Sequence, residues 1–452
     1  MRSLSYKGFI LENSAIWEAA KKLRNDPARA SLLQIGYRYL CDNPNQNMAY
    51  RQKKTWIHPL LRVVLDFAGH SYITWGLCVL AQICDAAYCL YCAITYDGYF
   101  YAAVSFVMCL FNLIVYAIVN SVEAKAYNRV MDYSDLKGAN KPHNMSEATF
   151  LMLMGLEAIG KNCDSHNTTS VSSIRKRLVN RSIVEMLTVH FLLSIPWFTG
   201  VVVNLKTHLV REEVWLALLS ASVLYAKLSM VLNGAQAAFF IRLNQRLVEL
   251  ETRRVQLEVR TATTKDVQNL PVRVKRLLIE SHSITNKEHS FYVLWGPVIL
   301  FQLALLGIGI IQAQNVTNGE QYCIPYWVFL SELQPLLSIM VMTHGFARLN
   351  LFMERDVEQD ITELALSMSY LKGKKGGKEG EDDDHKIDNI IQQLRLLERL
   401  DSRPCVLNFD FVPTMESSRA LIRVVFTGIG LLGPYILVAL GSSMSDGYMC
   451  LD

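Results

Sequence analysis

Charged side chains are scarce in this sequence: Asp, Glu, Lys and Arg make up 19% of its 452 residues. A soluble domain usually carries about 25% charged residues, so the chain is short of the charge that a water-facing surface needs. The charges are also uneven, because they cluster between long apolar runs. Runs of about 18 or more apolar residues are typical of transmembrane helices. The sequence therefore predicts an all-α, polytopic membrane protein.

Several other signatures are missing. The N-terminal part has no short apolar core followed by a small-residue cleavage site, so we expect no signal peptide. Half of the ten cysteines lie within apolar runs, where a thiol behaves as a small apolar residue, so we expect no metal and no cofactor. The sequence also lacks a Gly-rich phosphate loop, and His190, His208 and His344 fall on separate segments. We therefore expect neither an enzyme nor a nucleic-acid-binding protein.

Seven apolar runs are long enough to cross a bilayer: Tyr72–Tyr96, Phe100–Val122, Val184–Leu205, Val214–Ile241, Phe291–Gln312, Cys323–Gly345 and Leu421–Leu440. Basic residues that flank spans are retained on the cytoplasmic side. Many Lys and Arg precede the first run or follow the second and fourth runs, whereas only Lys206 and Arg211 fall on the opposite side. We therefore predict a cytoplasmic N-terminus and an extracellular C-terminus, in a protein of the plasma membrane.

The parts between the spans suggest a division of the chain. Residues 1–71 form a cytoplasmic N-terminal segment, and residues 72–345 contain spans one to six with cytoplasmic helical extensions. Residues 346–420 form a cytoplasmic loop with an insert at 372–386 that has no apolar residue and is expected to be disordered, followed by an amphipathic helix at 387–400. Residues 421–440 are the last span, and residues 441–452 an extracellular tail. The long apolar stripes of the extensions predict a cytoplasmic helical bundle.

Some residues inside or beside the spans are candidates for modification or function. Ionisable residues within spans are costly and often functional, and here they are Asp85, Lys227 and Glu332. Lys227 can pair with either carboxylate, and the sequence does not distinguish between them. On the predicted exterior, Asn315 begins a glycosylation sequon. Cys323 and Cys450 lie on the same side, either as a disulfide or as two free thiols.

The last apolar run contains Pro434-Tyr435, five apolar residues from Ile436 to Leu440, and then Gly441-Ser442. This arrangement resembles the insect gustatory receptor family and its divergent nematode members, whose last helix carries Thr-Tyr, four or five apolar residues, and then Gln-Phe. Tyr435 and the apolar run match, while Pro434 replaces the Thr and Gly441-Ser442 replaces the Gln-Phe. Ile241-Arg242-Leu243-Asn244-x-x-Leu247 also looks like the family's Leu-Asn-x-x-Leu motif. Span number, inverted topology and loop lengths match over nearly the whole chain.

This resemblance implies a homotetrameric, ligand-gated, nonselective cation channel, or a heteromer with related subunits, in which the last helix lines the pore. The family's hydrophobic gate would fall at Val438, three residues past Tyr435, with Ser442 on the next pore-facing turn. A ring of Val side chains can gate by dewetting. The agonist is a small molecule, or the stimulus is light or peroxide. Its pocket is expected in the outer half of the bundle, with the aromatic candidates Trp197, Trp327 and Tyr101.

Two readings compete with the sensory channel. A transporter or a scaffold protein could share the topology, although transporters often have internal repeats and none is evident here. Each candidate residue also has an ordinary structural interpretation. Val438 could face lipid, the aromatic residues could be interfacial anchors, and Lys227 could form a purely structural pair. The sequence alone does not decide between these alternatives.

Overall fold

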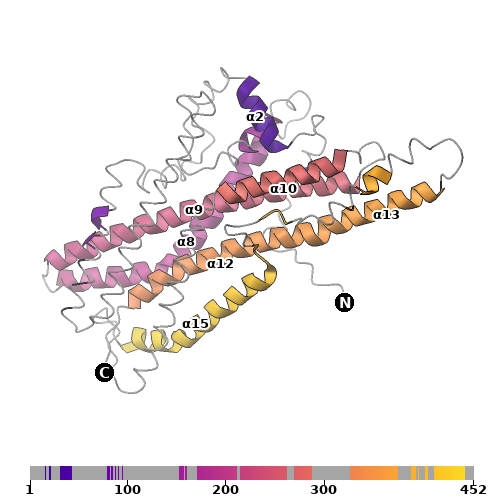
Figure 1. Ribbon diagram of the computed structural model, residues 1–452. Helices are drawn as coiled ribbons and strands as arrows, with labels where there is room; N and C mark the ends of the chain where they lie inside the picture. Colours follow the sequence, from indigo (N-terminus) through magenta and orange to yellow (C-terminus); the bar gives the residue numbers. More distant parts are fainter. Residues whose placement is uncertain are drawn as a thin grey trace.

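The computed structural model describes residues 16, 20–21, 31–42, 79–81, 83–84, 87, 90, 94, 152–156, 158–159, 171–210, 214–261, 269–287, 326–374, 388–392, 395, 403–405 and 412–442. In these residues the chain forms helices and no strand, which confirms the all-α prediction. Figure 1 shows the named helices, which are α2 (Leu32–Asp42), α8 (Val171–Val210), α9 (Val214–Arg260), α10 (Leu270–Lys287), α12 (Tyr326–Phe352), the π-helical turn η2 (Met353–Val357), α13 (Glu358–Lys374) and α15 (Met415–Ser442).

Helices α8 and α9 form a long antiparallel pair (Figure 1). α9 is 47 residues long and continues through Arg260, well beyond the expected end of the fourth span at Ile241. Its C-terminal half, Leu243–Glu258, is rich in Leu, Gln, Glu and Arg, which have high helix propensity. α10 packs against this half of α9.

A second long helical rod consists of α12, η2 and α13, which follow each other without a break. The π-helical turn shifts the register between α12 and α13 while the helix continues. This rod runs beside α9 (Figure 1), and both α12 and α13 contact it. α13 ends at Lys374, so its last turn overlaps the start of the expected insert.

The helix starts of α2 and α15 carry ordinary capping residues. Ser31 Oγ accepts the backbone N–H of Gln34 at 3.2 Å, as an N-cap does. At the start of α15, Thr414 Oγ1 accepts the N–H of Ser417 at 3.1 Å, and Ser417 Oγ accepts the N–H of Thr414 at 3.0 Å. This reciprocal pair acts as a capping box and fixes where α15 begins.

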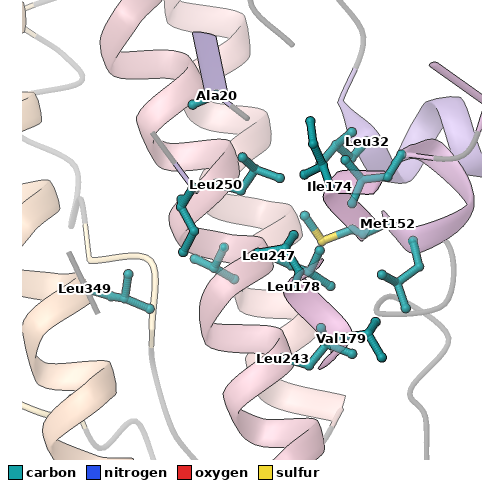
Figure 2. Close-up of a cluster of buried hydrophobic side chains, with 14 of the residues drawn as sticks. Ala20, Leu32, Met152, Ile174, Leu178, Val179, Leu243, Leu247, Leu250 and Leu349 are labelled. Atoms are coloured by element: carbon teal, nitrogen blue, oxygen red, sulfur yellow. The ribbon is translucent and has the colours of Figure 1, made fainter. Parts of the chain in front are cut away.

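The larger hydrophobic core lies where α8, α9 and α12 meet α2 and the helical residues 152–159 (Figure 2). Its centre includes Leu178, Leu243 and Leu247, each no more than 2% exposed. Gly155 marks a close approach in this core, because a Cβ at this position would lie 2.0 Å from the backbone oxygen of Leu32. No other residue fits there without a backbone shift.

The second core joins the far half of α9 to α10, the end of α12, η2, α13 and the helical residues around 390. Met353 and Val357 of the π-helical turn are fully buried in it. Ile390 and Ile391, which lie on the apolar face expected for the 387–400 helix, are also buried here. A smaller cluster around Met340 and Val425 packs α12 against α15.

Two of the expected spans, Phe100–Val122 and Phe291–Gln312, lie outside the described residues. In the part of the chain that the structure describes, none of the helices combines the length and the apolarity that a membrane crossing requires.

Candidate functional site

The described helices converge at a buried cluster of charges near the junction of α8, α9 and α12. Glu185 of α8 accepts hydrogen bonds from Arg242 Nε at 3.2 Å and from Arg246 Nη2 at 2.5 Å, both from α9. It also accepts one from Arg181 Nε at 3.2 Å, one turn earlier on α8. The side chains of Arg242 and Arg246 are only 5% and 1% exposed, whereas that of Arg181 is 54% exposed. One carboxylate therefore holds two buried guanidinium groups.

The electrostatics of this cluster follow from burial. Desolvation lowers the pKa of Arg246 to about 10, with Glu185 acting in the opposite direction. The pKa of Arg242 is lowered for the same reason. With a pKa of about 10, Arg246 stays protonated at neutral pH, and Glu185 is the carboxylate that compensates this buried charge. Such a group is strongly destabilised when one partner is removed.

Gln245 extends the cluster to α12. Its Nε2 donates to the backbone oxygen of Met342 at 2.9 Å, and its Oε1 accepts from Arg242 Nη1 at 3.3 Å. Gly345 makes room for this amide, because a Cβ there would lie 2.6 Å from both Nε2 and Oε1 of Gln245. The single side chain of Gln245 thus connects the ion cluster on α8 and α9 to the backbone of α12.

α12 in turn contacts α15 through a polar pair. His344 Nδ1 lies 3.0 Å from Ser418 Oγ, within hydrogen-bond distance. Ser418 is 1% exposed and sits in the first turn of α15. α8, α9, α12 and α15 are therefore linked in sequence by polar contacts at one level of the bundle.

A second buried ionisable group lies one turn further along α9. Glu249 is 0% exposed, and its Oε1 is 3.5 Å from Arg253 Nε. Burial raises the pKa of Glu249 to about 8, and the nearby Arg253 offsets part of that rise. The guanidinium of Arg253 also stacks over Phe352 at 4.5 Å from the ring centroid, a cation–π contact to α12.

The contacts between α9 and the α12–α13 rod continue beyond Arg253. Gln256 Nε2 and Arg260 Nε both donate to Asp360 Oδ2, at 2.9 and 2.8 Å. The order of partners along both helices is the same, so α9 and the rod run parallel along a polar seam. Among the described residues, no group of three or more His, Cys, Asp and Glu could hold a metal ion.

The residues predicted for the pore lie on the last helix. Tyr435, Val438 and Ser442 belong to the C-terminal half of α15, with side chains outside the described part. α15 does pack against α12, and the described side chains in this contact belong to the N-terminal half of α15. The structure therefore positions the helix that carries the expected gate.

The remaining candidates divide into two groups. Trp197 lies on α8, Lys227 on α9, and Trp327 and Glu332 on α12, again with side chains outside the described part. The other group falls outside the described residues altogether and comprises Tyr101, Asp85, Asn315, Cys323 and Cys450. The pairing of Lys227 stays open.

Sequence reasoning did not identify the ion cluster. Arg242 and Arg246 follow an apolar run. This position is typical of basic residues that flank a span and are exposed to water. Their burial depends on Glu185, which precedes them by 57 and 61 residues. The available signal was Glu185, a carboxylate at the start of another apolar run. Its neighbours in the sequence offer Arg181 as a partner and do not indicate Arg242 or Arg246.

Comparison with known proteins gives no match, whether to a family model, to a curated protein or to a solved structure. The resemblance to the gustatory receptors rests on the residues quoted from the sequence.

Proposed function

We propose that the chain is a seven-span membrane protein with an inverted topology that forms a ligand-gated, nonselective cation channel of the gustatory-receptor type. It acts as a sensory receptor for a small molecule, for light or for peroxide. The proposal takes its topology and residue motifs from the sequence. The observation that supports it best is the opposite placement of apolar and charged side chains in the two halves of the long helices.

In the halves that we expect to span the bilayer, large apolar side chains face outward. Along the expected spans of α8 and the start of α9, each of the following is at least 47% exposed: Val184, Phe191, Leu192, Ile195, Val202, Val214, Trp215 and Leu218. Single exposed apolar residues are common on soluble proteins, but many of them on two adjacent helices are unfavourable in water. Lipid chains would cover such a surface without cost.

In the other halves, which we expect in the cytoplasm, polar and charged side chains are enclosed. Arg242, Arg246 and Glu249 are at most 4% exposed, on a stretch of α9 that is buried on all sides. This half resembles the interior of a helical bundle, as the predicted cytoplasmic anchor requires. On α9 the exposed apolar side chains are described up to Leu218 and the buried stretch from Ile241, the expected inner end of the fourth span.

The placement of α15 is compatible with a pore formed by several copies of the chain. α15 packs on α12 by one side, while Val424, Phe426 and Leu431 are 50–56% exposed. A pore-lining helix needs one face for its own subunit and another for its neighbours. Four copies around an axis would bury these residues and bring four Val438 side chains together.

Two aromatic candidates for the agonist pocket lie on neighbouring helices. Trp197 is on α8 and Trp327 is in the first turn of α12, and these helices pack against each other. Both residues belong to the ends that we expect on the outer side. An aromatic pocket there would be reached from outside the cell.

Whole-cell recording from cells that express the chain alone tests the channel directly. A panel of tastants, peroxide and short-wavelength light is applied to the wild type, to Val438→Ala and to the control Leu437→Ala, whose side chain projects about 100° away on a helix. We expect an evoked or constitutive cation current that Val438→Ala alters and Leu437→Ala leaves in place. Tetramers at the cell surface without current under every stimulus would contradict the channel, and substrate uptake without current would favour a transporter.

Glycosylation tests the topology separately. We expect the sequon at Asn315 to be modified, so that a glycosidase and Asn315→Gln produce the same loss of apparent mass. Asn144, Asn167 and Asn180 also begin sequons, on a loop that we expect in the cytoplasm. Modification of any of these three residues would contradict the predicted topology.

A further inference from the structure

A single buried amide holds the segment that leads into α15. Asn350 lies near the end of α12 and is 3% exposed. Its Nδ2 donates to the backbone oxygens of Cys405 at 2.8 Å and of Pro413 at 3.1 Å, and its Oδ1 accepts the backbone N–H of Cys405 at 2.9 Å. A primary amide has two donors and two acceptor lone pairs. Three of these four sites are used on backbone groups 55 and 63 residues away.

The two contact points have a special place in the chain. Cys405 and Pro413 bracket the stretch that precedes α15, and Pro413 is followed directly by Thr414, the capping residue of that helix. Cys405 is 0% exposed, so its backbone groups need partners inside the protein. Asn350 supplies them, and it thereby ties the entrance of α15 to α12.

Other contacts converge on the same segment. The Nε2 atom of His282, on α10, lies 2.8 Å from the backbone oxygen of Arg403. On the other side, Ser418 of α15 contacts His344 of α12 at 3.0 Å. The described residues before α15, 403–405 and 412–414, are therefore held against α10 and α12, and Asn350 makes the largest number of their described hydrogen bonds to these helices.

We propose that Asn350 is a positioning residue that fixes the start of α15 to α12 and so transmits movements of the helical bundle to α15. The second part rests on the proposed function, because it assigns the pore to α15. Displacement of the 405–413 stretch would shift and rotate α15 as a rigid helix, including the positions of Val438 and Ser442. Movement of α12 would reach the gate by the same route.

The effect of removing the amide follows from its partners. In Asn350→Leu, a change of similar size, three backbone groups lose their hydrogen bonds in a buried place. Unsatisfied buried groups are costly, and water is the nearest alternative partner. The stretch is therefore expected to leave α12, and Cys405 becomes accessible.

Thiol labelling of the full-length protein in lipid nanodiscs measures this release without any channel activity. Burial raises the pKa of the Cys405 thiol and keeps it unreactive in the wild type. We expect maleimide labelling of the Cys405 peptide, quantified by mass spectrometry, to be about tenfold faster or more in Asn350→Leu. The matched control is Asn244→Leu, because Asn244 is also 3% exposed and also follows an Arg-Leu pair, but on α9. We expect the control to leave the Cys405 rate unchanged.

Cross-linking then reports the position of α15. In a His344→Cys/Ser418→Cys double variant, a short bifunctional thiol reagent should join α12 to α15, and adding Asn350→Leu should reduce the yield several-fold. In cells, Asn350→Leu should shift the agonist dose response or the basal current at equal surface expression, while Asn244→Leu should not.

The outcomes are separable. If Cys405 stays protected, or if the cross-link yield stays unchanged, Asn350 does not fix the start of α15 to α12. Release of Cys405 with an unchanged dose response overturns the coupling to the gate. Absence of current in the wild type as well contradicts the proposed function, while labelling and cross-linking still decide the role of Asn350.

Discussion

The buried ion cluster makes a quantitative prediction for Glu185→Gln. This change removes the carboxylate that Arg242 and Arg246 share while leaving the size of the side chain almost unchanged. The two guanidinium groups, 5% and 1% exposed, cannot turn to solvent without opening the contact between α8 and α9. Loss of one partner of a buried ion pair costs about 3–5 kcal/mol.

The expected cost falls at the lower end of that range, because the Gln amide keeps one oxygen that can accept a hydrogen bond. We therefore expect a loss of about 3 kcal/mol, which corresponds to about a hundredfold change in an opening equilibrium. Arg181→Ala is the control. The side chain of Arg181 is more than half exposed, so we expect the loss of its ion pair with Glu185 to cost less than about 1 kcal/mol.

Hydrogen exchange of the full-length chain in nanodiscs measures the opening locally. The amides of residues 241–250 should lose about two orders of magnitude of protection in Glu185→Gln and little in Arg181→Ala. Replacing the whole cluster with apolar residues, as Glu185→Leu with Arg242→Met and Arg246→Met, should restore most of the protection, because no buried charge is left unpaired. Equal protection in Glu185→Gln and Arg181→Ala would refute the cluster as an energetic feature.

Three further changes test the packing around this junction. Gly345→Leu must displace the Gln245 amide, which lies 2.6 Å from the new Cβ, and should cost about 1–3 kcal/mol in thermal stability, whereas Gly430→Ala, with nothing within 4 Å, should not. Leu247→Ala, at a side chain that is 0% exposed, should cost about 2–5 kcal/mol in the same assay, and a loss below 1 kcal/mol would place it outside the core. Burial raises the pKa of Glu249 to about 8, against about 4.3 in an unfolded chain. Between these two pH values the folded state holds a proton that the unfolded state has lost. The free energy of unfolding therefore falls as the pH rises from about 4.3 to about 8. Glu249→Gln should therefore be more stable than the wild type above pH 8 and equal to it only below about pH 4 in pH-resolved thermal unfolding, and equal stability at all pH values would argue against the buried carboxylate.

The helices themselves could be predicted because their signals are local. Apolar spacing and the lack of breaks after Ile241 indicate a helix that continues, and α9 does continue to Arg260. The start of α2 at Leu32 is also a local feature, because Ser31, the residue directly before it, supplies the cap. Such features depend on neighbours within one or two turns.

The polar contacts could not be predicted, because each joins residues that are far apart in the chain. Glu185 with Arg246, Gln245 with Met342, and Gln256 with Asp360 are separated by 61, 97 and 104 residues. The π-helical turn between α12 and α13 adds a register shift, and no residue type in Met353–Val357 predicts such a turn. The sequence predicts an apolar stripe on one side of the helix beyond Ile241. In the structure α9 is buried on all sides there, so that Arg242 and Arg246 are buried as well.

The triplet Arg-Leu-Asn shows this difference most directly, since it occurs at 242–244 on α9 and at 348–350 on α12. In both copies the Leu is 0% and the Asn 3% exposed, and the arginines are 4% and 8% exposed. The local sequence and the degree of burial are thus nearly the same. Yet Asn350 holds the backbone of Cys405 and Pro413, because the chain brings these two residues against α12 at that position. The role of a buried amide is set by the backbone groups that the rest of the chain brings to it, so Asn350→Leu and Asn244→Leu should differ in their effect on α15 although the two sites look alike in sequence.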